Sequence, residues 1–295
     1  MKSILLIGGS NIDYIGTSDL HLIKKQSNIG KVSVHFGGVL RNTCENLTRL
    51  GNSCTFITAI GNDVYGIKMK DFMEKMGIKL VIPSTLFSSS TNIVINDCDH
   101  IMNVGVCDDR IINDISLDFI KTNSSLIKEF KYLVIDANLK EEVIDYIFSE
   151  FKEQKIICAG ISKNKIVKFK NYLNKIFLLK CNILEAQTLI DFDLVDQDLV
   201  GGLLARGIKN VVVSNSSHDI YYGTDNRDIG KVMVEEIKEY ESTTGCGAAL
   251  LSGVIDNLLL GNSLKESVIF GNKLASLTLN CIGGTCEEIA QFAHK

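Results

Sequence analysis

Short runs of β-branched residues alternate with helical segments along almost the whole chain of 295 residues. Strands that alternate with helices favour the α/β class, in which a mostly parallel sheet carries helices on both faces. Buried strands are expected at Ile4–Ile7, Cys54–Ile57, Tyr132–Ile135, Lys155–Cys158, Ile176–Leu179 and Asn210–Ser214. Helices are expected at Asn42–Leu50, Val64–Met76, Glu141–Phe151, Leu199–Arg206 and Ala248–Leu260.

Two stretches break this alternation, because they have the pattern of strands and carry no helix. Lys31–Phe36 alternates in the manner of a strand, and Thr91–Val106 has the pattern of a β-hairpin. We expect Lys31–Phe36 and Thr91–Val104 to be paired in a small antiparallel β lid. The predicted lid comprises residues 13–36 and 91–106, and the predicted main α/β nucleotide-binding domain comprises residues 1–12, 37–90 and 107–295. Because such a lid has sheet edges to protect, a homodimer that pairs two lids is one solution.

Composition excludes several classes of protein. Hydrophobic residues at 45% and charged residues at 22% can build a sizeable core, which excludes intrinsic disorder. The net charge is −4 and the 31 basic residues form no long run, so neither nucleic acid nor a lipid surface is an expected partner. The apolar runs are too short to span a membrane, and Ile4–Ile7 is too short for a signal-peptide core. Nine cysteines without a C-x-x-C pair predict scattered reduced thiols in a cytoplasmic protein.

A glycine pair opens the first candidate site, because Gly37 and Gly38 lie just before a predicted helix. A backbone without Cβ atoms can approach a ligand closely. Asn42, in the first turn of that helix, would then aim its side-chain amide at a hydroxyl group of a substrate. The alternative is a tight loop whose glycines serve backbone geometry alone.

Polar residues follow the first predicted strand and form the second candidate site. Asn11 and Asp13 lie beyond Ile4–Ile7, where the binding crevice of an open α/β sheet is found. They offer an amide and a carboxylate to sugar hydroxyl groups. The segment lacks the G-x-G-x-x-G spacing, which disfavours a dinucleotide site. A turn capped by the Asn and Asp side chains is the alternative.

Small residues open the predicted helix that begins at Ala248. Within Ser242–Ala249, the loop of Gly245, Cys246 and Gly247 would expose backbone N–H groups at the positive end of the helix dipole. Such an anion hole suits a phosphate, or the charge that develops on a phosphoryl group during transfer. The stretch is not a Walker A loop, because no Gly-Lys-Ser/Thr follows. An ordinary Thr-capped helix start is the alternative.

Asn182 and Glu185 are three residues apart, so on one helical turn they share a face and can hold a hydrated Mg²⁺ with phosphates. The alternative is that Asn182 only caps a helix. No cluster of Cys and His has zinc spacing, because the five His lie far apart in the sequence. No G-x-S-x-G is present from which a Ser-His-Asp hydrolase could be built.

In this order and at these distances, the four motifs resemble the PfkB-type, ribokinase-like carbohydrate and nucleoside kinases. Gly37-Gly38, Asn42, Gly51 and Gly61 have the spacing of that family's N-terminal signature. Ser242–Ala249 is similar to its C-terminal signature, D-T-T-G-A-G-D-A. Within the family, the segments most similar to pseudouridine kinases are Ser27–Val32, Gly37–Asn42 and Val134–Asn138.

The resemblance implies an ATP-dependent kinase that uses Mg²⁺ and phosphorylates a hydroxyl group of a sugar or nucleoside. It implies a substrate site at Asn11, Asp13, Gly38, Arg41 and Asn42. It implies a nucleotide site at Asn182, Ser214, Thr243, Gly245 and Gly247, an anion hole at Gly245, Cys246 and Gly247, and Mg²⁺ held near Asn182 and Glu185, largely through water.

The chain departs from the family at Ala248, where the family has an Asp that accepts the proton of the attacking hydroxyl. A positioned general base is worth ~10²–10⁴-fold, and a methyl group cannot replace it. Leu40 replaces a usual Gly, and we expect its side chain to crowd the substrate pocket. Two functions remain open, namely an impaired kinase and an inactive homologue that binds ligands or regulates.

Overall fold

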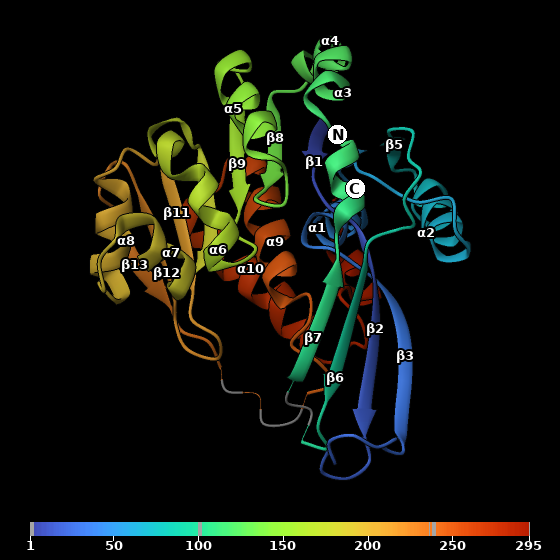
Figure 1. Ribbon diagram of the computed structural model, residues 1–295. Coiled ribbons are helices and arrows are strands. Elements are labelled where there is room, and N and C mark those ends of the chain that lie inside the picture. The colour runs from blue at the N-terminus through green and yellow to red at the C-terminus, as the bar shows by residue number, and fades with distance from the viewer. Residues whose placement is uncertain (1–2, 100–101, 236, 238–239, 295) are drawn as a thin grey trace.

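The computed structural model describes residues 3–99, 102–235, 237 and 240–294. Its largest feature is a nine-stranded sheet in the order β13-β12-β11-β10-β9-β8-β1-β4-β5 (Figure 1). The pairs from β5 to β11 are parallel, whereas β12 and β13 are antiparallel additions at one edge. The strands are β1 (Ser3–Ile7), β4 (Ser53–Ile57), β5 (Lys79–Val81), β8 (Tyr132–Asp136), β9 (Lys155–Ala159), β10 (Leu178–Asn182), β11 (Asn210–Ser214), β12 (Ile220–Thr224) and β13 (Ile229–Val232).

Helices cover both faces of this sheet, which confirms the predicted α/β class. In β1, Ile4 and Leu6 belong to one apolar cluster and Leu5 and Ile7 to another, so alternate side chains enter cores on opposite faces. The helices are α1 (Val39–Arg49), α2 (Val64–Lys75), α3 (Leu117–Thr122), α4 (Ser124–Lys128), α5 (Glu141–Glu150), α6 (Lys163–Ile166), α7 (Ile183–Ile190), α8 (Asp196–Leu204), α9 (Cys246–Leu260) and α10 (Leu264–Leu279), with 3₁₀ segments at Arg110–Asp114, Val167–Lys175 and Glu287–Phe292.

None of the helices in the described parts of the chain is long and apolar enough to cross a membrane.

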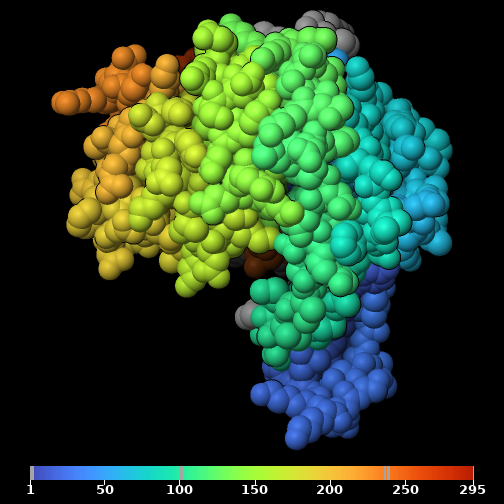
Figure 2. Space-filling model, turned by 45° about the horizontal axis from the view of Figure 1, so that its top comes forward, coloured from blue at the N-terminus to red at the C-terminus, as the bar shows by residue number. Residues whose placement is uncertain are grey.

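A second, four-stranded sheet has the order β3-β2-β6-β7 and projects from the main body, blue and green in Figure 2. Its strands are β2 (Asn11–Ser18), β3 (Gly30–Gly37), β6 (Thr91–Asn96) and β7 (Met102–Asp108). We call it the small sheet.

The predicted direct pairing of Lys31–Phe36 with Thr91–Val104 is wrong, because β2 lies between β3 and β6. The β2–β6 pair is parallel, while β2–β3 and β6–β7 are antiparallel. Sequence reasoning missed β2 because it contains Asn, Asp and Gly, which are depleted in strands. Pairing with two neighbours holds it extended.

The two faces of the small sheet differ in polarity. Asp13 lies opposite Asn92 in the register of β2 and β6, and both line the cavity described below. One position further along, Tyr14 pairs with Ile93, which pairs with Val106, so apolar side chains occupy the opposite face. On this outer face Tyr14 packs against α2, whereas Val106 on β7 is 65% exposed, so the part of the face away from α2 is an apolar surface open to solvent.

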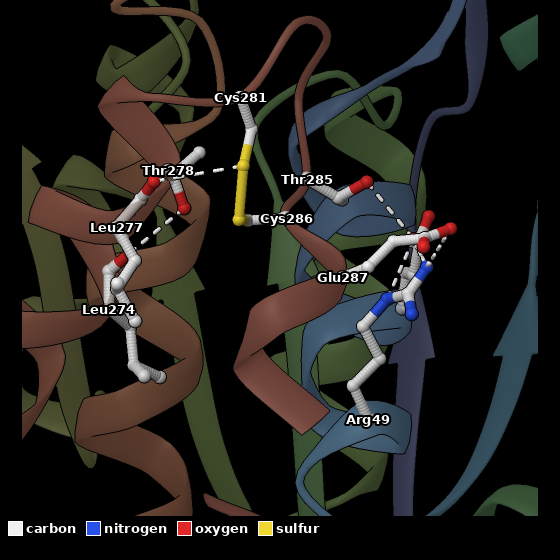
Figure 3. The surroundings of a disulfide bond; sticks show 9 residues. Arg49, Leu274, Leu277, Thr278, Cys281, Thr285, Cys286 and Glu287 are labelled. Atoms are coloured by element: carbon white, nitrogen blue, oxygen red, sulfur yellow. Dashed lines mark hydrogen bonds and ion pairs between the residues drawn. A yellow bond between two sulfur atoms is a disulfide. The ribbon is translucent and has the colours of Figure 1, made fainter. Parts of the chain in front are cut away.

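The prediction of reduced thiols is wrong for one pair of cysteines. Cys281 and Cys286 form a disulfide in the turn that follows α10, and the other seven cysteines are free (Figure 3). The spacing did not reveal this pair, because only the reversal of the chain after α10 brings the two residues together. The turn also contacts α1, since Thr285 Oγ1 donates a hydrogen bond to Glu45 Oε1 at 3.0 Å.

Candidate active site

A cavity of about 390 Å³ lies at the carboxyl ends of the central strands, beside the polar face of the small sheet. The fold brings residues from distant parts of the sequence into its wall. Those predicted from the sequence are Asn11, Asp13, Gly38, Asn42, Gly245, Gly247 and Ala248. The position agrees with the rule that open α/β sheets bind ligands beyond the carboxyl ends of their strands.

Asp13 presents a carboxylate on the small-sheet side of the cavity. Its Oδ1 accepts hydrogen bonds from Asn11 Nδ2 at 2.5 Å and Asn92 Nδ2 at 3.1 Å. A Cβ at position 37 would overlap Asp13 Oδ2, so Gly37 allows the carboxylate to lie against the backbone of β3. Burial raises the pKa of Asp13, while Asn92, the charge of Arg41 and Asn11 oppose the shift. Oδ2 has no hydrogen bond to any of the described residues and can accept one from a ligand hydroxyl.

Asn42 lines the cavity from the first turns of α1, and Arg41 does not line it. The Arg41 side chain is 2% exposed, and its guanidinium forms an ion pair with Glu45 at 2.6 Å and donates to Asn42 Oδ1 from Nε at 3.1 Å. Because Asn42 Oδ1 is occupied, its Nδ2 group is the part available to a ligand oxygen. The structure therefore gives Arg41 contacts that orient Asn42.

The amino end of α9 borders the cavity. Gly245 caps this helix with φ 87°, where a Cβ would overlap Gly284 in the turn closed by the disulfide. The first helical bond runs from the Ala249 N–H to Gly245 O at 2.9 Å, and no described residue accepts from the Gly247 or Ala248 N–H groups. The predicted anion hole thus has unpaired donors at the positive end of a helix.

A second cavity of about 590 Å³ adjoins the first. The predicted nucleotide residues that line it are Asn182, Ser214, Thr243 and Gly247, and Cys246 of the predicted anion hole lines it as well. Its apolar wall includes Tyr240, Leu250 and Ala275. Gly245 and Ala248 line only the first cavity, so the start of α9 separates the two spaces.

Lys180, the middle residue of β10, lines both cavities, and sequence reasoning missed it. Its Nζ would lie 2.9 Å from a Cβ at Gly247, and it has no hydrogen bond or ion pair with any described residue. Burial lowers the pKa of Lys180, and the charge of Glu185 opposes this shift. The sequence did contain a signal for this site residue, because Lys180 directly follows the predicted buried strand Ile176–Leu179.

Asn182 and Glu185 form the capping box of α7. Asn182 Oδ1 accepts from the Glu185 N–H, and Glu185 Oε2 accepts from the Asn182 N–H, both at 2.9 Å. Asn182 therefore caps α7, which is the alternative role that the sequence left open. Burial raises the pKa of Glu185, while the hydrogen bond from Asn182 and the charge of Lys180 lower it. Glu185 Oε1 is outside the capping box and has no hydrogen bond to a described residue, so an oxygen is left that suits a hydrated Mg²⁺.

The structure also corrects the expectation for Leu40. Leu40 is fully buried in the apolar core and lines neither cavity, so the expected crowding of the substrate pocket is wrong. Its position in α1 directs the side chain toward the sheet.

Lys165, which sequence reasoning missed, lines the first cavity and bonds to Asp109 Oδ2 and Asn138 Oδ1, both at 2.7 Å.

Known proteins are similar to this chain in both sequence and fold. The family described as pfkB family carbohydrate kinase matches residues 1–290. A pseudouridine kinase from Escherichia coli is 30% identical over 287 residues, which cover 94% of this chain and 90% of that protein. The crystal structure of a ribokinase from Thermotoga maritima has a TM-score of 0.82 at 20% identity, covering 99% of this chain and 98% of that one.

A structure from E. coli described as a ribokinase II, solved in complex with ATP and Mg²⁺, has a TM-score of 0.84 at 16% identity and covers 99% of both chains. The family match spans almost the whole chain, and both neighbours share its fold. This chain therefore belongs to the pfkB family of carbohydrate kinases.

Proposed function

We propose that this protein binds ATP and a sugar or nucleoside, with pseudouridine as the first candidate, and transfers the γ-phosphoryl group at an impaired rate. The observation that carries this proposal is the meeting of two cavities at Lys180, Gly247 and the start of α9. A substrate hydroxyl and a phosphoryl group bound in them would approach each other where N–H donors and an ammonium are available. The 30% identity to a pseudouridine kinase supports the choice of nucleoside.

In this proposal the first cavity holds the substrate. Asp13 Oδ2 accepts a hydrogen bond from a hydroxyl group, and Asn42 Nδ2 donates one to an oxygen. The second cavity holds the nucleotide, with Ser214 and Thr243 in its wall. Mg²⁺, when bound, neutralises charge on the phosphate oxygens, and Asn182 with Glu185 would hold it through water.

Ala248 supports the impaired rate. It is 4% exposed, lines the first cavity and offers only a methyl group where the resemblance implies a catalytic Asp. The same residue favours the second candidate, a homologue that binds both ligands and regulates without turnover. The two candidates share the binding site and differ in whether phosphorylated product forms.

The binding proposal is tested by a thermal-shift screen of pseudouridine, ribose, fructose and adenosine, with and without Mg·ATP. A ligand at 100 times its Kd adds ~2.7 kcal/mol of stability, which is roughly 5 °C for a chain of this size.

Asp13→Asn removes one charge from the substrate site and is expected to weaken substrate binding by ~10–100-fold, because hydrogen bonds to a charged group are worth ~1.5–3 kcal/mol. The shift caused by Mg·ATP should persist.

Asp118→Asn is the matched control, because Asp118 is exposed in the first turn of α3, away from both cavities. It should leave both shifts unchanged. If Asp13→Asn also leaves the substrate shift unchanged, Asp13 is a turn residue and the substrate site is misplaced. If no compound of the panel shifts the melting temperature, the proposed substrate class is wrong.

We also propose that two copies pair through the outer face of their small sheets. Val32 and Val106, on the edge strands β3 and β7, are 76% and 65% exposed, which is a large apolar exposure for a sheet face in water. We expect a dimer by light scattering at micromolar concentration, and a monomer for Val106→Asp. Val167→Asp changes an exposed valine of the main domain and should remain dimeric. A monomeric unmodified protein would contradict the proposal.

A further inference from the structure

A group of potential metal ligands lies at the end of the small sheet, where the β2–β3 connection meets the β6–β7 turn (Figure 1). It consists of His21, Asp97 and Cys98, whose ligand atoms all lie within 4.8 Å of one another. His21 and Cys98 are 77 residues apart, so no short zinc-binding spacing in the sequence indicates them. The parallel pairing of β2 with β6 brings the two loops together.

The two distances from the imidazole to the other ligand atoms match those of a tetrahedral zinc site. Zinc bonds to nitrogen and oxygen at ~2.0–2.2 Å and to sulfur at ~2.3 Å, so tetrahedral angles place N and O about 3.3–3.4 Å apart and N and S about 3.5–3.6 Å apart. His21 Nδ1 lies 3.3 Å from Asp97 Oδ1 and 3.5 Å from Cys98 Sγ. An ion can therefore enter between these atoms with little movement of the chain.

Backbone groups already hold the carboxylate in place. Asp97 Oδ1 accepts hydrogen bonds from the Cys98 N–H at 2.8 Å and the Leu22 N–H at 3.2 Å. Hydrogen bonds of this kind orient metal ligands in known sites. The His21 side chain is 84% exposed and that of Asp97 19%, so the group is open to solvent on the imidazole side. A metal ion can enter there and keep a water molecule.

We propose that His21, Asp97 and Cys98 bind a borderline divalent transition-metal ion such as Zn²⁺, with water as the fourth ligand. Imidazole and thiolate ligands favour such an ion over Mg²⁺ or Ca²⁺. As the metal–sulfur bond forms, the Cys98 thiol releases its proton to solvent. The inference is independent of the proposed kinase function, because the site is distant from the cavity. Ser18, at the end of β2 near these loops, is roughly 17 Å along the strand from Asp13.

The bound ion would join two loops that otherwise meet through polar contacts at the end of the small sheet. The strands that lead from these loops, β2 and β6, carry Asp13 and Asn92 at their other ends. Metal binding is therefore expected to raise the melting temperature, because the ion binds the folded loops and finds no preformed site in the unfolded chain.

The test is a titration of the metal-free, full-length protein with Co²⁺, followed by displacement with Zn²⁺. The protein is kept under argon without added reductant, so that Cys98 stays a thiol and the Cys281–Cys286 disulfide stays intact. We expect one Co²⁺ per chain, a thiolate-to-cobalt charge-transfer band in the near ultraviolet, and loss of that band on addition of Zn²⁺.

Variants assign the ligands. Cys98→Ser should abolish the charge-transfer band, whereas Cys107→Ser, which alters an exposed thiol of β7 outside the group, should keep it. His21→Ala and Asp97→Asn should each weaken Zn²⁺ binding by more than the ~10–100-fold expected for an outer partner of a metal ligand. If the unmodified protein gives no band, the three residues form only a hydrogen-bonded turn and the proposal is wrong. Persistence of the band in Cys98→Ser would overturn it as well, by placing the metal at another thiol.

Discussion

Replacing Ala248 by Asp is expected to raise the rate of phosphoryl transfer by ~10²–10⁴-fold, because the new carboxylate can accept the proton of the attacking hydroxyl. Ala248 lines the first cavity directly after Gly247, so a side chain there faces the reacting groups of the proposed complex. The other acid of α9 cannot substitute. Asp256 is 1% exposed and bonds to Asn52 Nδ2 and His294 Nε2, each at 2.7 Å.

The measurement is steady-state turnover of the substrate found in the thermal-shift screen, together with the affinity for Mg·ATP. A gain in kcat with unchanged nucleotide affinity indicates an interaction made only in the transition state. Ala248→Asn is the matched control, because it has nearly the size of Asp without a basic carboxylate, and it should give no gain. Unmodified protein that already turns over at ~1–100 s⁻¹ would refute the impaired rate. No gain in Ala248→Asp, despite binding of both ligands, would favour the regulatory candidate.

Replacing Lys180 by Met is expected to lower phosphoryl transfer by ~10²–10³-fold, the usual effect of removing one donor that stabilises transition-state charge. The measurement is best made in the Ala248→Asp background, where the rate is high enough to follow. Lys180 is the ammonium that lines both cavities, whereas Lys165, in the first cavity, is paired with Asp109. Met fills a similar volume, so the change removes the charge and keeps most of the packing.

Two controls separate charge from structure in this experiment. Lys180→Arg keeps the charge and should recover part of the rate. Lys168→Met alters another half-buried lysine, which bonds to Ala137 O and Leu139 O and lines neither cavity, and should leave the rate unchanged. An unchanged rate in Lys180→Met would exclude Lys180 from the reaction.

The affinity for ATP should also depend on pH through Lys180. Burial lowers the pKa of this amine in the free protein, and bound phosphate raises it by stabilising the ammonium. The complex therefore binds more protons than the free protein between these two pKa values, so ATP affinity should rise as the pH falls through that interval. In Lys180→Met this part of the pH dependence should be lost.

The elements whose signals are local follow from the amino-acid sequence alone. The apolar runs at Ile4–Ile7 and Cys54–Ile57 became the neighbouring strands β1 and β4, because β-branched residues bounded by turns favour buried strands. The glycine-rich stretches before α1 and α9 both reach the first cavity, since ligand sites of open α/β sheets lie beyond the carboxyl ends of the strands. Residue type and short spacing were enough for these predictions.

Which distant residues meet depends on how the folded chain packs. The placement of β2 between β3 and β6 depends on pairing across long connections, and the sequence of β2 does not encode its partners. Lys180 joins two cavities, and His21 meets Cys98, because of the path of the chain between them. Leu40 enters the core because the orientation of α1 directs it there. Such contacts arise from the packing of elements already formed, and spacing along the chain carries no information about them.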